Sequence, residues 1–371
     1  MNLNLKIFIC GAFGGVWMIQ RLNTMVVFNT HYPKTAKMNP NTPKTVVAPI
    51  FPAIKPLILL STDAEEMKDQ SALGNWSYEH KQYSRGKFQG SIFHTNTPRL
   101  QLSLTKRSSI FIRDGIPPGA TVISMTVSTN KPAIFRGRPL QSNHAMCLRH
   151  NEELDYLSTE PTMLLTIACS SQLVEQKTIE TTGRSLDLLR FSDRLVMREN
   201  CYSNRVNHLL SLLHFYHYQA DRLCSEEGIF FENEVLETIL GGVLALQDKY
   251  VYKLSLVQAK KAEQYIRANL RRPLSINDIC SATGTTERTL HLGFKERYGV
   301  TPSAFIQIMR LNEVRKELRL SSRHHTVTNL ATRWGYNHLS RFTEHYRRFF
   351  GELPSVTIKL NHSIVAQEHY H

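Results

Sequence analysis

The sequence predicts an α+β protein with a β-rich N-terminal domain, then helices, then an all-α C-terminal domain that contains two helix-turn-helix units. Three observations support this prediction. Short apolar runs rich in β-branched residues recur between turn signals over about residues 88–173. Beyond residue 170, apolar residues recur at spacings of three and four. In the last third of the chain, a short helical pattern, a glycine and a second helical pattern occur twice.

The chain of 371 residues is long enough for two domains. We expect residues 1–60 to be a mobile leader without an assigned fold, 61–184 the β-rich domain, 185–252 a helical linker, 253–360 the C-terminal helical domain and 361–371 a tail. The leader prediction rests on six prolines between Thr30 and Pro56. The apolar run Ile7–Ile19 has the length of a signal-peptide core and is shorter than the roughly 20 residues of a membrane-spanning helix. Secretion is the less favoured alternative, and we expect a cytoplasmic protein without a membrane segment.

The β-rich domain is predicted from apolar runs separated by turn signals such as Asp114-Gly115 and Pro117-Pro118-Gly119. The predicted strands are Gly90–Phe93, Leu100–Leu104, Ser109–Ile112, Thr121–Val127, Ala133–Phe135, Ala145–Leu148 and Met163–Ala168. Several short strands spaced by turns are typical of a small sandwich or a barrel, and the sequence leaves both open.

Three proline-free helices are expected after the strands, over Ser185–Val196, Val206–Leu223 and Asn233–Leu246. The stretch Val206–Tyr216 is more apolar than one buried helix face requires. Packing in its own core is the favoured explanation, and packing against a second subunit in a homodimer is the alternative.

The charge of the chain is concentrated in its last third. The whole chain carries 45 Lys and Arg against 31 Asp and Glu, a net charge of +14. Residues 253–371 hold 19 of these basic residues and nine of the acidic ones, which gives +10. A surplus of this kind indicates a polyanionic partner.

The same third of the chain contains an internal repeat. An apolar residue stands eight and five positions before Gly284, and the same pattern precedes Gly335, 51 residues later. Further matches follow at a spacing of 52, namely Leu290 with Phe342, Phe294 with Tyr346, Gly299 with Gly351 and Pro302 with Pro354. A repeat of this length predicts a duplicated supersecondary unit.

Each repeat is predicted to be a helix, a glycine turn and a second helix. In the first, Ser275 caps a helix over Ile276–Thr283, and Thr286 caps a second helix that runs to Arg297. In the second, the helices cover Val327–Trp334 and about residues 338–350. Pro302 opens a connecting helix over Ser303–Leu320.

This geometry is that of a helix-turn-helix, whose second helix lies in the DNA major groove. Leu290 and Phe294 face inward in the first unit, as do Phe342, Tyr346 and Phe349 in the second. The opposite faces then carry Glu287, Arg288, His291, Lys295, Leu339, Ser340, Thr343, Glu344 and Arg347. Arginine pairs with guanine, glutamate accepts from cytosine, and threonine or leucine contacts a thymine methyl. Lys295, Arg347 and Arg348 are better placed for phosphates. The alternative is a merely solvated charged face.

Residues 256–360 resemble the DNA-binding domain of AraC/XylS-family transcription regulators. The resemblance is carried by Ser275–Ile279, Arg288–Leu290, Tyr298–Pro302, Gly335-Tyr336 and Phe350–Ser355. It implies a seven-helix domain that binds two successive major-groove segments of promoter DNA. By position, the family's base-reading residues fall on Arg288, His291, Leu292, Leu339, Ser340, Thr343 and Glu344. Leu292 and Glu344 depart from the usual residue types, which leaves the target sequence open.

Within this family, Asn337–Phe342, Phe350–Ser355 and Pro132–Leu140 are similar to regulators of ethanolamine-utilisation operons. The resemblance implies an effector-sensing N-terminal domain, with ethanolamine and adenosylcobalamin as candidate effectors and RNA polymerase as a candidate partner. We therefore predict a sequence-specific, effector-responsive transcription regulator.

No enzymatic motif competes with this prediction. The histidines His80, His94, His144 and His150 have neither HxH nor HExxH spacing, and the sequence contains no Walker loop, GxGxxG or GxSxG. We expect no catalytic activity, no cofactor and no metal. The alternative function is a ligand-binding or ligand-modifying module with an accessory DNA-binding domain, which would need a catalytic group of residues within 60–250. A general, sequence-independent DNA binder is a third hypothesis.

Overall fold

The structure is a computed structural model that describes residues 16–21, 24–29, 50–51, 58–113, 115–150, 152–189, 193–197, 199–224, 226–244, 254–320 and 326–358. The described residues belong to two units, one within residues 1–46 and the other within residues 47–371.

The N-terminal unit contains an antiparallel hairpin of β1 (Val16–Arg21) and β2 (Thr24–Asn29). Both strands are rich in β-branched, aromatic and other apolar residues, which suits an extended conformation. The prediction of a leader without a fold therefore missed this hairpin. Most of the stretch from Thr30 to Pro56 lies outside the described residues, as does the first part of the apolar run Ile7–Ile19.

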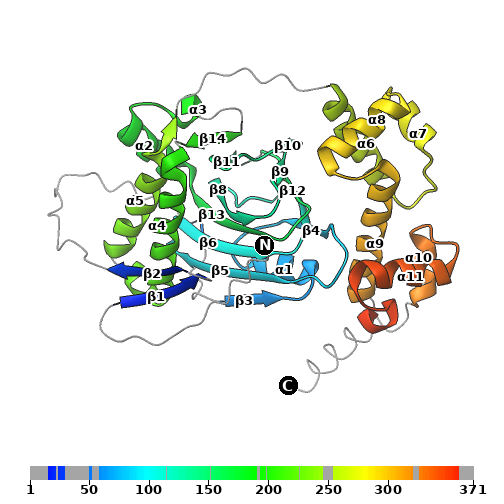
Figure 1. Ribbon diagram of the computed structural model, residues 1–371, viewed down its shortest axis with the longest axis horizontal. Coiled ribbons are helices and arrows are strands. Elements are labelled where there is room, and N and C mark those ends of the chain that lie inside the picture. Colours follow the sequence, from blue (N-terminus) through cyan, green and yellow to red (C-terminus); the bar gives the residue numbers. More distant parts are fainter. Residues whose placement is uncertain are drawn as a thin grey trace. The chain divides into compact units, whose positions relative to one another are not determined.

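The β-rich domain contains an eight-stranded antiparallel sheet in the order β15-β14-β11-β8-β13-β6-β5-β3 (Figure 1). Its strands are β3 (Ile58–Ser61), β5 (Gly90–Asn96), β6 (Leu100–Arg107), β8 (Ala120–Thr129), β11 (His144–Arg149), β13 (Thr162–Ser170), β14 (Arg194–Met197) and β15 (Val243–Leu244). β3 begins within the predicted leader and pairs with β5.

A second antiparallel sheet has the order β10-β9-β12-β7-β4. Its strands are β4 (Glu79–Gln82), β7 (Ile110–Arg113), β9 (Ile134–Phe135), β10 (Arg138–Pro139) and β12 (Asp155–Ser158). All seven predicted strands lie in one sheet or the other. The two sheets and helix α1 (Ala64–Ala72) share a core that includes Met67, Ile112, Val122, Phe135 and Tyr156. Because both described sheets have free edges, the arrangement is a sandwich.

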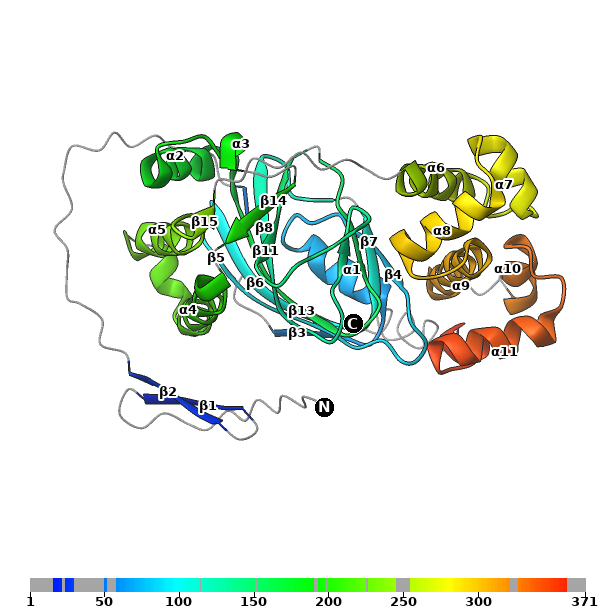
Figure 2. The ribbon, with the colours of Figure 1, turned by 45° about the horizontal axis from the view of Figure 1, so that its top comes forward.

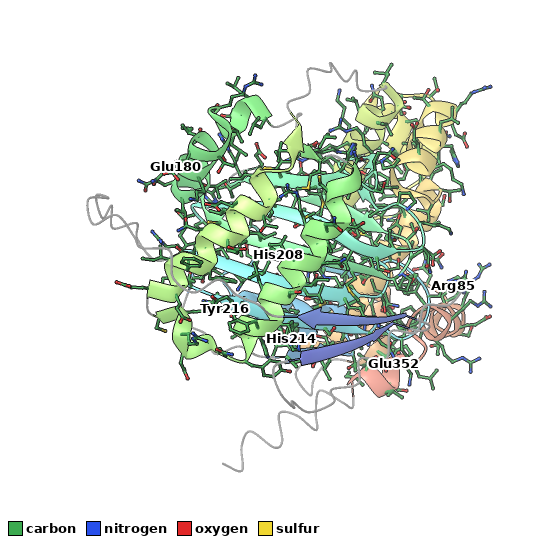
Figure 3. All side chains as sticks on the ribbon, turned by 60° about the vertical axis from the view of Figure 1, so that its left-hand side comes forward. Arg85, Glu180, His208, His214, Tyr216 and Glu352 are labelled. Carbon is green, nitrogen blue, oxygen red and sulfur yellow. The ribbon has the colours of Figure 1, made fainter. Side chains whose placement is uncertain are left out.

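Helices cover the other face of the eight-stranded sheet (Figures 1 and 3). They are α2 (Ser171–Thr182), α3 (Leu186–Leu189), α4 (Glu199–His217), η1 (Ala220–Cys224) and α5 (Glu226–Leu240). Figure 3 labels His208 on α4, whose Nε2 lies 2.9 Å from Oε1 of Glu234 on α5. The apolar residues of α4, among them Leu209 and Leu213, are buried in the core of this domain. This burial accounts for the strongly apolar character of α4 without a second subunit.

The predicted helix Ser185–Val196 is wrong in its second half. After the single turn of α3 the chain returns to the sheet, where β14 pairs with β11 and β15. Leu195 and Met197 are fully buried there. A short apolar run suits either a helix or a strand, and here the open sheet edge decided the outcome. The predicted linker therefore contributes two strands to the large sheet.

The C-terminal domain consists of α6 (Leu254–Ala268), α7 (Ile276–Thr283), α8 (Glu287–Tyr298), α9 (Pro302–Leu320), α10 (Val327–Arg333) and α11 (Leu339–Phe350). α7 and α9 begin and end within one residue of the prediction. Buried residues of all six helices form one hydrophobic core, with Phe305 and Met309 of α9 in its middle. The connecting helix therefore serves both helix-turn-helix units.

Candidate nucleic-acid interface

The first helix-turn-helix unit is fixed by local hydrogen bonds. The Ser275 hydroxyl accepts from the Asp278 N–H at 3.1 Å, and the Asp278 carboxylate accepts from the Ser275 N–H at 2.9 Å. These hydrogen bonds lower the pKa of Asp278. Gly284 ends α7 with a φ of +62°, a conformation that favours glycine. Thr286 then caps α8 by accepting from the Thr289 N–H at 3.2 Å.

The second unit repeats this construction with small differences. Thr326 caps α10 by accepting from the Asn329 N–H at 3.2 Å. α10 ends one residue earlier than predicted, at Arg333, and Gly335 makes the turn with a φ of +83°. α11 begins at Leu339, and His338 at its N-cap makes no side-chain hydrogen bond to the helix.

The inward and outward faces of α8 and α11 are as predicted. Leu290, Phe294, Phe342 and Tyr346 are buried, and burial raises the pKa of the Tyr346 hydroxyl to about 12. The remaining candidate residues lie on the outer faces. Arg288, Leu292, Lys295, Leu339, Ser340, Glu344, Arg347 and Arg348 are exposed, and His291 and Thr343 are partly exposed.

The exposed charges differ in their intramolecular partners. Among the described residues, Arg288, Lys295 and Arg347 have no ion-pair partner. Arg348 pairs with Glu344 one helical turn away, and His291 Nε2 lies 3.7 Å from Glu287 Oε1. A base contact by Glu344 and a phosphate contact by Arg348 therefore both require this exposed pair to separate.

One exposed cation on α11 was missed by the sequence prediction. Arg341 is exposed in the first turn of α11 and is seven positions before Arg348, so both lie on one stripe of the helix. The helical spacing alone could have identified it as a further phosphate-contacting candidate.

Comparisons with known proteins agree with this geometry. A family model described as a helix-turn-helix domain matches residues 279–359. A probable thc operon regulatory protein of Rhodococcus erythropolis is 30% identical over 132 residues, which cover 33% of this chain and 40% of that protein. The XylDLEGF operon transcriptional activator of Pseudomonas putida is 34% identical over 101 residues, with 27% and 32% covered. The chain thus spans less than half the length of these relatives.

One of the similar solved structures likewise covers only part of this chain. A probable AraC family regulator from Rhodopseudomonas palustris is 32% identical and covers 28% of this chain and 97% of its own, with a TM-score of 0.27. The C-terminal domain belongs to the AraC/XylS family. It is an AraC-type DNA-binding domain with two helix-turn-helix units.

The AraC-type domain packs on the outer face of the five-stranded sheet (Figure 2). Side chains alternate along each strand of this sheet. On β7, Ile112 faces the sandwich core, whereas Phe111 packs in the core of the AraC-type domain. On β12, Tyr156 and Leu157 divide in the same way. One sheet therefore lies between the interior of the β-rich domain and the DNA-binding helices.

Buried polar contacts join the two domains at the C-terminal ends of the recognition helices. Arg297 of α8 pairs with Asp155 of β12. The Tyr83 hydroxyl donates to the Tyr298 carbonyl at 2.7 Å, and the Gly86 N–H donates to the Phe349 carbonyl of α11 at 2.8 Å. Both recognition helices are thus anchored to the β-rich domain, and their N-terminal halves project away from these contacts.

The connecting helix α9 is held to the same sheet. Asn312 accepts from the Gln82 N–H and donates to the Gln82 carbonyl, each at 2.9 Å. Lys81 is almost fully buried and donates to Glu313 at 2.6 Å. Burial opposes ionisation of this lysine, but Glu313 and Glu79 raise its pKa, so the ammonium stays charged. Sequence analysis did not predict these contacts, because their partners are more than 200 positions apart.

Within the described part of the chain, no cluster of three His, Cys, Asp or Glu side chains is placed to hold a metal ion. No described helix is both long and apolar enough to span a bilayer.

Proposed function

We propose that this protein is a transcription regulator that recognises promoter DNA of defined sequence and responds to an effector bound by its β-rich domain. The observation that carries the proposal is the pair of capped helix-turn-helix units, with free cations on exposed recognition helices and buried contacts anchoring both helices to a second domain. A cytoplasmic location is part of this proposal.

In this proposal the outer faces of α8 and α11 read bases. The base-reading residues are Arg288, His291, Leu292, Leu339, Ser340, Thr343 and Glu344. Lys295, Arg347 and Arg348 contact phosphates. The exposure of these faces supports this assignment, and the free guanidinium of Arg288 is available for bidentate pairing with guanine.

Regulation requires that the effector bind one arrangement of the two domains more tightly than another, with a coupling of about 1–3 kcal/mol in typical cases. The five-stranded sheet is the element through which we expect this coupling, because it contacts both the sandwich core and the AraC-type domain. RNA polymerase and a second copy of the chain are further candidate partners. Ethanolamine and adenosylcobalamin are effectors to test on the basis of the sequence resemblance.

The test is to incubate the purified full chain with sheared DNA from its own genome at physiological salt and to sequence the retained fragments. Enrichment of a few promoters that share two short elements about 10 base pairs apart is expected, because this is one helical turn of DNA. Uniform retention of all fragments, falling steeply with salt, would instead indicate the general DNA binder. The Arg288→Ala variant is the matched control, since it removes one base contact and leaves the phosphate contacts in place.

A further inference from the structure

A small cavity lies inside the β-rich domain, next to the end of β6. Polar side chains of Gln101, Ser103, Thr105 and Arg107 line it from β6, and His94 lines it from β5. Leu59, Leu73, Trp76 and Ile92 contribute apolar groups. The remaining lining residues are Gln70, Ser71, Gly74, Tyr78 and Thr166. The cavity has a volume of about 40 Å³. This is room for roughly three water-sized groups.

Arg107 is the unusual member of this lining. Its side chain is buried, with 5% of the residue exposed, and it makes no hydrogen bond or ion pair with any described residue. Burial lowers the pKa of its guanidinium, and the hydroxyls of Tyr78 and Tyr156 lie within electrostatic reach of it. Burial raises the pKa of both hydroxyls, so both are uncharged at neutral pH.

A buried arginine without a carboxylate partner is strongly disfavoured in a finished protein interior. The other arginines that are buried in the described part of the chain all pair with a carboxylate, Arg138 and Arg194 with Asp193 and Arg297 with Asp155. The hydroxyls around Arg107 are already engaged, since Ser103 and Thr105 donate to carbonyls of β13. No carboxylate among the described residues therefore serves as a counter-charge for Arg107.

We propose that this cavity binds the carboxylate of a small organic acid, with the Arg107 guanidinium as its counter-ion. The inference rests on the proposed effector-responsive function and names the chemical class of the effector. A carboxylate has three heavy atoms, which matches the volume of the cavity. Arginine pairs with such a group through two parallel hydrogen bonds.

The remainder of the acid is apolar in this proposal. Leu73 is 53% exposed and Leu59 is partly exposed, so the cavity opens to solvent between apolar side chains at its β3 and α1 side. A second cation beside Arg107 would be repelled. Ethanolamine, which is a cation at neutral pH, is therefore excluded from this cavity.

The site is connected to the DNA-binding domain by one strand. Tyr156 lies in the sandwich core within electrostatic reach of Arg107, and its neighbour Asp155 pairs with Arg297 of recognition helix α8. A carboxylate that draws Arg107 toward itself changes the surroundings of β12. Tyr156, which Arg107 reaches electrostatically, is one position along β12 from the contact that anchors α8.

The test compares acids with their uncharged amides on the full chain. Thermal unfolding and titration calorimetry are measured with acetate, hexanoate and benzoate, with acetamide, hexanamide and benzamide, and with ethanolamine. We expect at least one acid to raise the Tm, and its amide and ethanolamine to leave it unchanged. The Arg107→Met variant keeps an unbranched stem without the guanidinium and should bind that acid at least about tenfold more weakly, because a charge-assisted pair is lost.

Two controls make the outcome decisive. Arg85→Met removes an exposed arginine that does not line the cavity and should bind the acid as the wild type does. In the absence of acid, Arg107→Met should be at least as stable as the wild type, since no ion pair is broken. Equal binding by Arg107→Met and wild type, equal effects of acids and amides, or no effect of any acid would overturn the proposal. Retention of specific genomic fragments in any of these cases would leave the proposed function standing.

Discussion

The ion pair between Asp155 and Arg297 joins β12 of the β-rich domain to recognition helix α8. We predict a large coupling energy between these two residues. Only 4% of the Arg297 side chain and 6% of the Asp155 side chain are exposed, so water cannot replace a missing partner. Arg297 also donates from Nε to the Tyr298 hydroxyl at 3.0 Å, and this contact remains when Asp155 is replaced.

The magnitude follows from this burial. Two unit charges in contact at about 3 Å attract by roughly 5 kcal/mol at an effective dielectric constant of about 20. Removing one partner leaves an uncompensated buried charge, so Asp155→Ala and Arg297→Ala should each lower the free energy of unfolding by about 3–5 kcal/mol. The double variant removes both charges together. It should lose about 2–3 kcal/mol less than the sum of the two single variants.

Urea unfolding of the four proteins measures this coupling, with tryptophan fluorescence and circular dichroism as independent probes of two-state behaviour. The exposed pair of Glu344 and Arg348 on α11 is the matched control. The same cycle there should give a coupling of only about 0.3–0.5 kcal/mol. Additive losses from Asp155→Ala and Arg297→Ala would refute the reasoning, since they would mean that the two domains do not pack through this pair.

Three further predictions concern DNA recognition, acid stability and helix capping. Arg288→Ala should reduce discrimination at one base position by about 1–3 kcal/mol. Arg348→Ala should weaken binding to matched and scrambled DNA alike and make the DNA affinity less dependent on salt concentration. Similar behaviour of both variants on both DNAs would contradict the assignment of Arg288 to a base and Arg348 to a phosphate. Burial, reinforced by His217, lowers the pKa of His94 from 6.5 to about 4, so the unfolded chain binds a proton that the folded chain does not between these values. Stability should therefore fall by about 3 kcal/mol from this group as the pH drops from 6.5 to 4, and a His94→Gln variant should lack this part of the loss in urea titrations across that range. Ser275→Ala removes the cap of α7 and should cost about 1 kcal/mol, measured as a lower urea midpoint with an unchanged slope; an unchanged midpoint would mean that the capping box is not formed in solution.

Most of the C-terminal domain could be predicted because its signals are local. The caps Ser275 and Thr286 act on backbone groups within three residues, and Gly284 determines a turn by its own conformation. The inward stripe of Leu290 and Phe294 follows from helical periodicity. The same signals occur in both copies of the internal repeat, so both helix-turn-helix units could be predicted from the sequence.

Most strands of the β-rich domain could be predicted from the sequence, but the order in which they pair could not. Alternating apolar runs identified the central strands, but they do not specify which strands pair or which sheet a strand joins. β14 shows the limit, because Leu195 lies within the predicted helix Ser185–Val196 and instead belongs to a strand that pairs with β11.

Local residue patterns are sufficient to predict a tandem helix-turn-helix domain in the last third of this chain and the outward faces of its helices. The contacts that attach this domain to the β-rich domain, and the surroundings of Arg107, follow from long-range packing. Arg107 resembles any other strand arginine in the sequence. Its position at a cavity, with no ion-pair partner among the described residues, depends on α1 and the eight-stranded sheet. The pairing of Asp155 with Arg297 spans 142 positions. Contacts at such separations depend on the packing of whole sheets and helices, so the local pattern of residues does not predict them.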